Sequence, residues 1–275
     1  MLEIIPIQTG TARIKPTQIR GQGHGEDRRK NLIADPDWTT LPILAWVIVH
    51  PEGVIVVDTG ETPRAMEAGY YPAEHPYYRY LLRVDVQPEE AIGVQLQARG
   101  IGARDVHTVV LTHLHTDHAG GLSDLPHSAV WVHESELARA QGDSGRALGY
   151  LPHRFPEGFA PRTYTFADGP VGLFAHAQRI TAAPDVWVVP TPGHTPGHVS
   201  VLVTDGEHRT FIAGDATYSE ATLCDEAVDG ISPDEGVALD TIRAIRTWLQ
   251  EGPTVYLPSH DLQSVTRLRD RIPTR

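Results

Sequence analysis

The segment that most constrains this chain is Thr112-His113-Leu114-His115-Thr116-Asp117-His118-Ala119-Gly120-Gly121, which directly follows the apolar run Val109-Val110-Leu111. It places three imidazoles and one carboxylate within six positions. Imidazole and carboxylate together suit zinc, iron, cobalt or manganese rather than calcium or magnesium. Four ligands so close in sequence can reach two metal ions only if the backbone turns tightly after the strand, and the small residues that end the segment allow that turn. We therefore predict a metal site here, with a solvated polar loop as the alternative.

The length and charge of the chain narrow its class. Its 275 residues can bury a substantial core and still form one domain, 1–275. A formal net charge of -12 argues against an extended nucleic-acid surface, which needs an excess of Lys and Arg. The lone Cys224 excludes an intrachain disulfide and a cysteine-based zinc cluster. Because we find neither a signal peptide nor an apolar run that could span a bilayer, we expect a cytoplasmic protein that binds no membrane.

The hydrophobic pattern predicts many strands and few helices. Residues 88–100, 135–141 and 234–249 are expected to be helical, the last with Val237, Ile242, Ile245 and Leu249 on its buried face. Residues 19–40, which are rich in Gly, Asp and Arg and lack periodicity, and residues 142–162, which contain Gly, Pro and scattered aromatics, are expected to be surface loops. Strands interspersed with helices indicate two sheets covered by helices, in an α/β or α+β arrangement. The predicted strands are the β-branched runs at 4–7, 44–49, 54–57, 106–111, 129–132, 186–189, 199–203, 210–213 and 255–257.

Three more residues of types that bind metals follow predicted strands. His194 comes after a glycine in Thr191-Pro192-Gly193-His194, Asp215 ends Ala213-Gly214-Asp215, and His260 ends Pro258-Ser259-His260. Sheet proteins commonly build sites from residues at the ends of several strands. Four strand ends that carry such residues are therefore a strong signal for one metal centre.

The order HLHTDH, GH, GD and SH resembles the metallo-β-lactamase-fold hydrolases over nearly the whole chain. The resemblance implies an αβ/βα sandwich of two central mixed sheets flanked by helices. It also implies that Asp58 supports the ligand loop and that His198 is structural rather than a ligand. The implied ligands of two divalent ions, zinc or alternatively cobalt, iron or manganese, are His113, His115 and His194 for one ion, Asp117, His118 and His260 for the other, and Asp215 as the bridge.

The residue that points to a substrate is Tyr218, three positions after Asp215. In the N-acyl-homoserine lactonases of this family a tyrosine at that spacing contacts the carbonyl region of the substrate. The resemblance therefore implies a quorum-quenching lactonase, in which two metals produce a bridging hydroxide. Tyr218 would stabilise the oxyanion and Asp117 would protonate the leaving alkoxide. The alternatives are a packed aromatic role for Tyr218, a phosphotriester or aryl-ester hydrolase, and a noncatalytic metal-binding protein.

Two features leave the substrate open. Thr116 occupies a position that is often larger and apolar in lactonases, so the pocket near the metals can differ. Five of the nine tyrosines cluster, and they could line a pocket for an acyl chain, form the interface of a homodimer, or simply pack a long connection. These tyrosines are Tyr70, Tyr71, Tyr77, Tyr78 and Tyr80.

Overall fold

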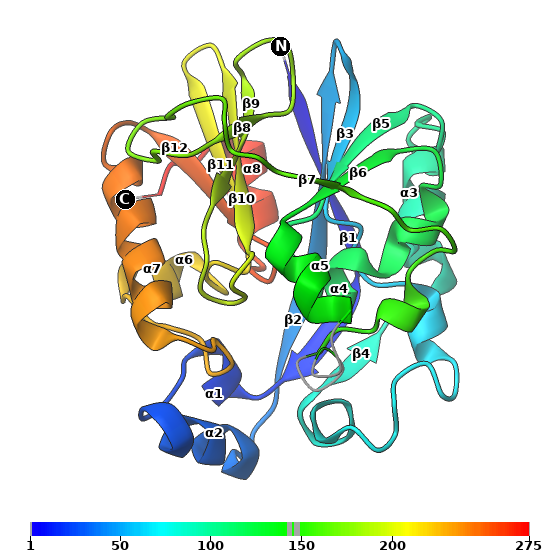
Figure 1. The fold of residues 1–275 in the computed structure, drawn as a ribbon, viewed down its shortest axis with the longest axis vertical. Helices are drawn as coiled ribbons and strands as arrows, with labels where there is room; N and C mark the ends of the chain where they lie inside the picture. The colour runs from blue at the N-terminus through cyan, green and yellow to red at the C-terminus, as the bar shows by residue number, and fades with distance from the viewer. Residues whose placement is uncertain (1, 142–144, 146–148, 275) are drawn as a thin grey trace. The chain divides into compact units, whose positions relative to one another are not determined.

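The computed structural model describes residues 2–141, 145 and 149–274, which form two compact units with one sheet each (Figure 1). The seven-strand unit comprises Leu2–Ile14 and Thr40–Tyr164. The five-strand unit comprises Lys15–Thr39 and Thr165–Arg275. The segment between the first two strands of the chain therefore belongs to the unit that is otherwise built from the C-terminal half.

The sheet of the seven-strand unit has the order β4-β1-β2-β3-β5-β6-β7. β2 and β3 form an antiparallel hairpin, whereas β3, β5, β6 and β7 run parallel. The carboxyl ends of β3 and β5 consequently meet at the same edge, which brings together the residues that follow these strands. The strands are β1 (Glu3–Ile14), β2 (Thr39–His50), β3 (Gly53–Val57), β4 (Arg83–Asp85), β5 (Val106–Val110), β6 (Ala129–Val132) and β7 (Arg162–Thr163).

Helices of this unit pack their apolar residues on the sheet. Ile92 and Leu96 of α3 are buried together with Ile7, Val47 and Val109 of the strands. The helical segments are η1 (Pro63–Met66), η2 (Tyr77–Leu81), η3 (Pro88–Glu90), α3 (Ile92–Ala98), α4 (Thr116–Ala119), η4 (Gly120–Asp124), α5 (Glu134–Gln141) and η6 (Pro152–Arg154).

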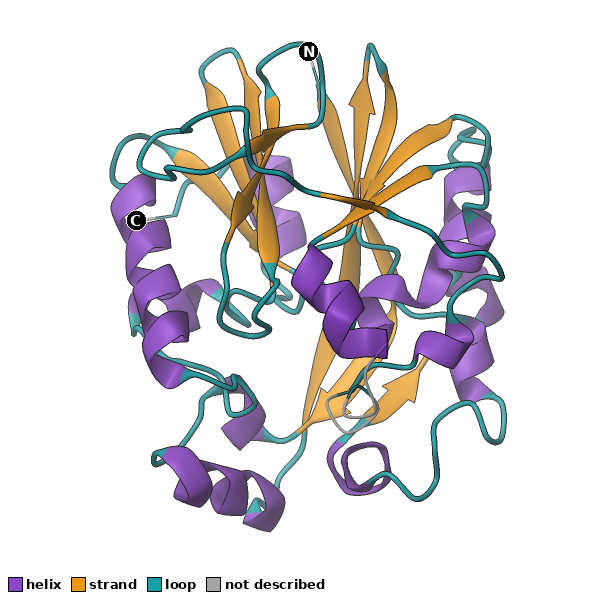
Figure 2. Ribbon diagram, in the orientation of Figure 1, coloured by secondary structure: helices purple, strands orange, loops and turns teal. Residues whose placement is uncertain are grey.

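The sheet of the five-strand unit has the order β12-β11-β10-β9-β8, with β11 and β12 parallel and the other pairs antiparallel. The helix α7 buries Ile242, Ile245 and Trp248 against Leu202 and Phe211 of this sheet, and α7 and α8 run beside it in Figure 2. The strands are β8 (Gln178–Arg179), β9 (Val186–Pro190), β10 (Val199–Asp205), β11 (His208–Gly214) and β12 (Thr254–Pro258), and the helices are α1 (Pro16–Ile19), α2 (Gly25–Ala34), α6 (Glu220–Cys224), α7 (Glu235–Leu249) and α8 (Ser264–Asp270).

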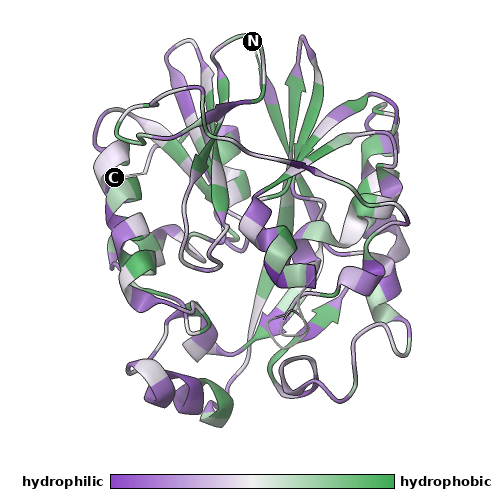
Figure 3. Ribbon diagram, viewed as in Figure 1, coloured by the Kyte–Doolittle hydropathy of each residue, from purple (hydrophilic) through white to green (hydrophobic). Residues whose placement is uncertain are grey.

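The structure confirms two mixed sheets flanked by helices. Every predicted strand is present, and the strands of both sheets are predominantly hydrophobic in Figure 3. The helices predicted at 135–141 and 234–249 are present, and Asp234 caps α7 by accepting hydrogen bonds from the backbone nitrogens of Gly236 and Val237. The helix predicted at 88–100 is divided at Ala91, whose ψ of 135° is not helical, into η3 and α3. Val237 itself is 40% exposed, so its assignment to the buried face was wrong. Ala238 is the buried residue of that turn, because it keeps the spacing to Ile242 and Ile245.

The prediction of a loop at residues 19–40 was also wrong. Residues Gly25–Ala34 form α2, whose composition favours a helix but whose apolar residues do not repeat at helical spacing. Arg28, one of four basic residues there, is buried and pairs with Glu235 at 3.0 Å. The loop expected at 142–162 contains η6, and its residues 142–144 and 146–148 lie outside the described part of the chain. Among the described residues no helix has the length and apolar character needed to cross a membrane.

Candidate functional site

The ligand segment of the seven-strand unit is braced by Asp58, which follows β3. One carboxylate oxygen, Oδ1, accepts a hydrogen bond from the Thr112 backbone nitrogen at 2.8 Å, and Oδ2 accepts one from Thr112 Oγ1 at 2.9 Å. Oδ2 also lies 2.8 Å from His118 Nδ1. Asp58 adopts the left-handed conformation, with φ of 60°, and is fully buried. The role expected for Asp58 as support of the ligand loop is therefore what the structure shows.

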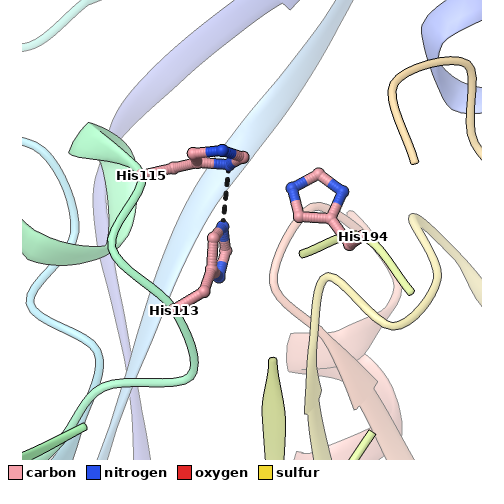
Figure 4. Close-up of side chains that lie close together, drawn as sticks. All are labelled: His113, His115 and His194. Carbon is pink, nitrogen blue, oxygen red and sulfur yellow. Dashed lines mark hydrogen bonds between the residues drawn. The ribbon is translucent and has the colours of Figure 1, made fainter. Parts of the chain in front are cut away.

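These contacts decide which ring nitrogen each histidine can offer to a metal. When His118 donates from Nδ1 to Asp58, its Nε2 carries the lone pair. His113 Nδ1 likewise faces Thr112 Oγ1 at 3.1 Å. His113 Nε2 and His115 Nδ1 point at each other 3.0 Å apart (Figure 4), and Asp117 Oδ1 lies 3.9 Å from His118 Nε2. Convergent imidazole nitrogens and a carboxylate form a donor set that suits a divalent metal.

The segment that follows Asp58, residues 59–61, packs against the helix α4 and the residues that follow it. Thr59 hydrogen-bonds the carbonyl oxygen of His118 through its backbone nitrogen at 2.7 Å and through Oγ1 at 3.0 Å. The Gly120 backbone nitrogen donates to Gly60 O at 2.9 Å. A Cβ on Gly120 would collide with Glu61, so glycine is required here by the close approach of two chain segments.

Glu61 is a buried carboxyl under the ligand helix. It accepts hydrogen bonds from Tyr71 Oη at 2.6 Å, from Tyr70 Oη at 3.3 Å and from the Thr62 backbone nitrogen at 2.9 Å, and it also hydrogen-bonds the side chain of Thr116. Burial raises the pKa of Glu61 to about 7, and the negative charge of Asp117 adds to the rise, whereas the hydrogen bonds of Tyr71 and Thr62 oppose it. A titratable group therefore lies directly behind the ligand segment.

The tyrosine cluster packs partly around this carboxyl. The rings of Tyr71 and Tyr78 stack with their centroids 4.7 Å apart, and Tyr70 meets Tyr71 edge to face at 5.0 Å. Tyr78 donates to Gly149 O at 2.8 Å. Tyr80, by contrast, is 56% exposed, so the side chains of the cluster do not share one environment.

The five-strand unit carries the other three predicted ligands. His194 follows β9, Asp215 follows β11 and His260 follows β12. Because β11 and β12 are parallel, Asp215 and His260 emerge at the same edge of the sheet. Asp215 Oδ2 lies 3.5 Å from His194 Nε2 and 3.3 Å from His260 Nε2. A buried carboxylate oxygen with an imidazole nitrogen on each side is chemically suited to bridge two metals.

Asp229 and His198 fix these ligands. Asp229 Oδ2 lies 3.2 Å from His194 Nδ1, so His194 presents Nε2 toward Asp215. Burial alone would raise the pKa of Asp229, but the neighbouring His194 and the hydrogen bonds from Ser232 and Ile231 hold it below its usual value. His198 accepts a hydrogen bond from the Asp215 backbone nitrogen at 3.0 Å on Nε2, and its Nδ1 lies 2.9 Å from Thr191 Oγ1. Both ring nitrogens of His198 therefore serve hydrogen bonds that position Asp215.

Tyr218 lies among the ligands of this unit. Its buried ring stacks on His260 with centroids 5.4 Å apart and meets His194 edge to face at 6.1 Å. Its hydroxyl oxygen accepts a hydrogen bond from Gln18 Nε2 at 3.1 Å. The phenol therefore lies at the candidate metal ligands of its own unit.

The structure thus groups four predicted ligands on one unit and three, with Tyr218, on the other. Sequence reasoning missed Glu61, Asp229 and Gln18, which support these residues. Like Asp58, Asp229 follows a valine and is soon followed by a glycine, so the sequence carried a weak signal for this residue. Glu61 and Gln18 carried none, since their roles arise from contacts distant in sequence.

A family model described as the metallo-beta-lactamase superfamily matches residues 38–260, most of the chain and parts of both units. The chain belongs to the metallo-β-lactamase superfamily. This agrees with the resemblance drawn from the ligand motifs, and the described donor sets have the His and Asp composition from which dimetal centres of the superfamily are built.

Two similar proteins match more than half of the chain each. An N-acyl homoserine lactonase of Bacillus cereus is 26% identical over 226 residues, 81% of this chain and 82% of the relative. A probable metallo-hydrolase of Mycobacterium tuberculosis is 31% identical over 177 residues, which are 62% of this chain and 56% of the relative. The match to this mycobacterial protein thus extends over little more than half of its length.

Solved structures show the same fold. An N-acyl homoserine lactone hydrolase with the product N-hexanoyl-L-homoserine at its catalytic metal centre superposes with a TM-score of 0.75 at 20% identity, over 96% of this chain and 94% of its own. A dizinc quorum-quenching lactonase gives a TM-score of 0.64 at 15% identity, over 94% of this chain and 87% of its own.

Proposed function

We propose that this protein is a dimetal lactonase that opens the ring of N-acyl-homoserine lactones and thereby acts in quorum quenching. The observation that carries the proposal is the placement of Tyr218 against His194 and His260, because it adds a phenol to a metal-ligand set at the position that lactonases of this family use. The relatives and solved structures named as lactonases support the same substrate class.

The proposed metal ligands are those that the motifs predicted. His113, His115 and His194 would hold one ion, Asp117, His118 and His260 the other, and Asp215 would bridge them. Within each unit the ring nitrogens and carboxylate oxygens fit this use, since Asp58 and Asp229 fix the imidazoles that they contact. Zinc is the proposed ion, because imidazole and carboxylate are usual ligands of zinc in catalytic sites, which keep a position open for water or substrate. Two bound divalent ions would lower the pKa of a water and polarise the ester carbonyl.

The chain's own residues supply the remaining chemistry. As the water oxygen adds to the lactone carbonyl carbon, negative charge develops on the carbonyl oxygen, and the Tyr218 hydroxyl donates a hydrogen bond to it. Asp117 accepts the proton that the attacking water loses, the ring C–O bond breaks, and Asp117 transfers this proton to the leaving alkoxide, which completes the hydroxy acid. Asp117 is suited to exchange protons with solvent, because its side chain is 22% exposed whereas that of His118 is buried.

The wider predictions stay with this proposal. The protein would bind a small lactone or ester and no nucleic acid, act in the cytoplasm, and fold as one domain, 1–275, a view that the family match across both units supports. The buried Tyr70 and Tyr78 with Tyr71 are proposed to accept the acyl chain, and a homodimer remains a prediction.

Turnover by the zinc-loaded protein tests the function. The panel contains acyl-homoserine lactones of several lengths, simple γ- and δ-lactones, paraoxon and S-lactoylglutathione. We expect the highest kcat/KM for an acyl-homoserine lactone, and a far higher value for paraoxon would overturn the assignment in favour of a phosphotriesterase. Tyr218→Phe should lower lactone turnover by about 10- to 100-fold, whereas Tyr80→Phe, which changes an exposed phenol, should not. Less than one equivalent of bound metal and no turnover at all would indicate a noncatalytic protein.

A further inference from the structure

A short N-terminal segment, residues 15–35, is built onto the five-strand unit rather than onto the strands that flank it in sequence. It contains α1 and α2, and it belongs to the same compact unit as Thr165–Arg275. Asp35 closes the segment on itself by accepting hydrogen bonds from the Thr17 backbone nitrogen at 2.9 Å and from Thr17 Oγ1 at 2.7 Å. The segment therefore has a defined internal structure.

The segment is attached to the loop 228–230. The Gly230 backbone nitrogen donates to Gln18 O at 2.7 Å, and the Gly21 nitrogen donates to Val228 O at 3.0 Å. The guanidinium of Arg28 hydrogen-bonds the carbonyl oxygens of Val228 and Asp229. A Cβ on Gly230 would collide with the carbonyl oxygen of Thr17, which shows how closely the two backbones approach. Asp229, in the middle of this loop, is the residue that orients His194.

The consequence of this attachment is that one side chain, Gln18, reaches the phenol of Tyr218. Gln18 is 2% exposed, and its Nε2 lies 3.1 Å from Tyr218 Oη. A carboxamide nitrogen can only donate a hydrogen bond, so the phenol oxygen is the acceptor in this contact. The O–H of Tyr218 must therefore point away from the Gln18 amide.

We infer that Gln18 is a positioning residue for Tyr218. The Gln18 amide directs the phenol proton toward the substrate and makes the Tyr218 hydroxyl a stronger hydrogen-bond donor. A hydroxyl that accepts a hydrogen bond is polarised, and its own donation becomes stronger. The inference rests on the proposed function of Tyr218 as the donor to the oxyanion. It adds a residue, 200 positions away in the sequence, that no metal-ligand motif contains.

Two substitutions separate donation from shape. Gln18→Met keeps the length of the side chain and removes the donor, while Gln18→Glu replaces the donor by an acceptor that competes for the proton of Tyr218. For Gln18→Met we expect kcat on the preferred lactone to fall by about three- to tenfold, the size of one hydrogen bond, with KM changed by less than about twofold. Gln18→Glu should reduce kcat at least as much. Gln22→Ala, an exposed glutamine of the same segment, is the matched control and should leave kcat unchanged.

A double-mutant cycle with Tyr218→Phe shows whether Gln18 acts through the phenol. The effect of Gln18→Met on kcat should disappear in the Tyr218→Phe background, because the hydroxyl that it positions is gone. An equal loss in both backgrounds, or an unchanged kcat for Gln18→Met in the wild-type background, would overturn the inference. Zinc content and the thermal midpoint of each variant, measured in parallel, identify a loss of kcat that comes from misfolding. If Gln18→Met is misfolded, the kcat of Gln18→Glu decides instead. The proposed function fails separately, if the wild-type protein hydrolyses no lactone.

Discussion

Glu61 makes the stability of the metal-free protein depend on pH in a direction opposite to that of an ordinary salt-bridged carboxylate. Burial raises its pKa from 4.5 to about 7. The folded protein therefore holds a proton that the unfolded chain releases between these two values, so the free energy of unfolding falls as the pH rises through that window. Each pKa unit corresponds to about 1.4 kcal/mol, and the full effect is about 3 kcal/mol. This loss of stability is absent below about pH 4.5 and complete above about pH 7.

The substitution Glu61→Gln tests this reasoning, because the amide cannot ionise and the surrounding hydroxyls of Tyr70, Tyr71 and Thr116 can turn to donate or accept. Denaturant unfolding of the chelator-treated proteins should show that the variant gains on the wild type by about 3 kcal/mol between pH 4.5 and pH 7.5. Glu89→Gln, which removes an exposed carboxyl of the same unit, controls for the change in net charge. A difference between wild type and Glu61→Gln that stays constant within about 1 kcal/mol across this range would refute the buried titration.

Further predictions concern the supports of the ligands. Asp229→Asn should weaken zinc binding by about 10- to 100-fold, measured by chelator competition, because it disturbs the hydrogen bond that fixes His194; unchanged affinity would show that the contact is dispensable. Gly120→Ala should lower the free energy of unfolding by at least about 2 kcal/mol in denaturant titrations, since the new methyl group collides with Glu61, and a stable variant would mean that the two segments can separate. Removal of metal by a chelator should lower the thermal midpoint, and added zinc should restore it; a midpoint that ignores zinc would contradict a metal centre in the folded state.

Much of the fold follows from local patterns in the sequence. The strands β9 to β12 are short β-branched runs bounded by turn residues, and such runs can be recognised from the local sequence alone. The helix α2 could not be found in the same way. Its residues form a helix through their intrinsic propensity, and it is fixed by Arg28, a charged residue whose burial depends on carbonyl groups 200 positions away. Hydrophobic periodicity has no means of registering such a helix.

The candidate site also contains residues that the local sequence predicts and residues that depend on contacts distant in sequence. The residues expected to bind metal lie next to strands, and the chemistry of imidazole and carboxylate makes them visible in a single sequence. Asp229 acts on His194 across 35 positions and Gln18 on Tyr218 across 200, and neither belongs to a repeated pattern. Residues that orient others are chosen by geometry, and many residue types can supply one hydrogen bond. The supporting residues therefore had to come from the structure.

The neighbours of Thr116 explain why a polar residue stands at this position. The position is often larger and apolar in lactonases, yet here the side chain hydrogen-bonds both Glu61 and Tyr71. An apolar residue at 116 would remove one of the hydrogen bonds to a buried carboxyl, which would lower the free energy of unfolding by about 0.5–1.5 kcal/mol. Conversely, with an apolar residue at position 61 the buried hydroxyl of Thr116 would keep only its hydrogen bond with Tyr71. Thr116 and Glu61 are therefore best understood as one polar pair, whose effect is to replace apolar packing behind Asp117 by a hydrogen-bonded network.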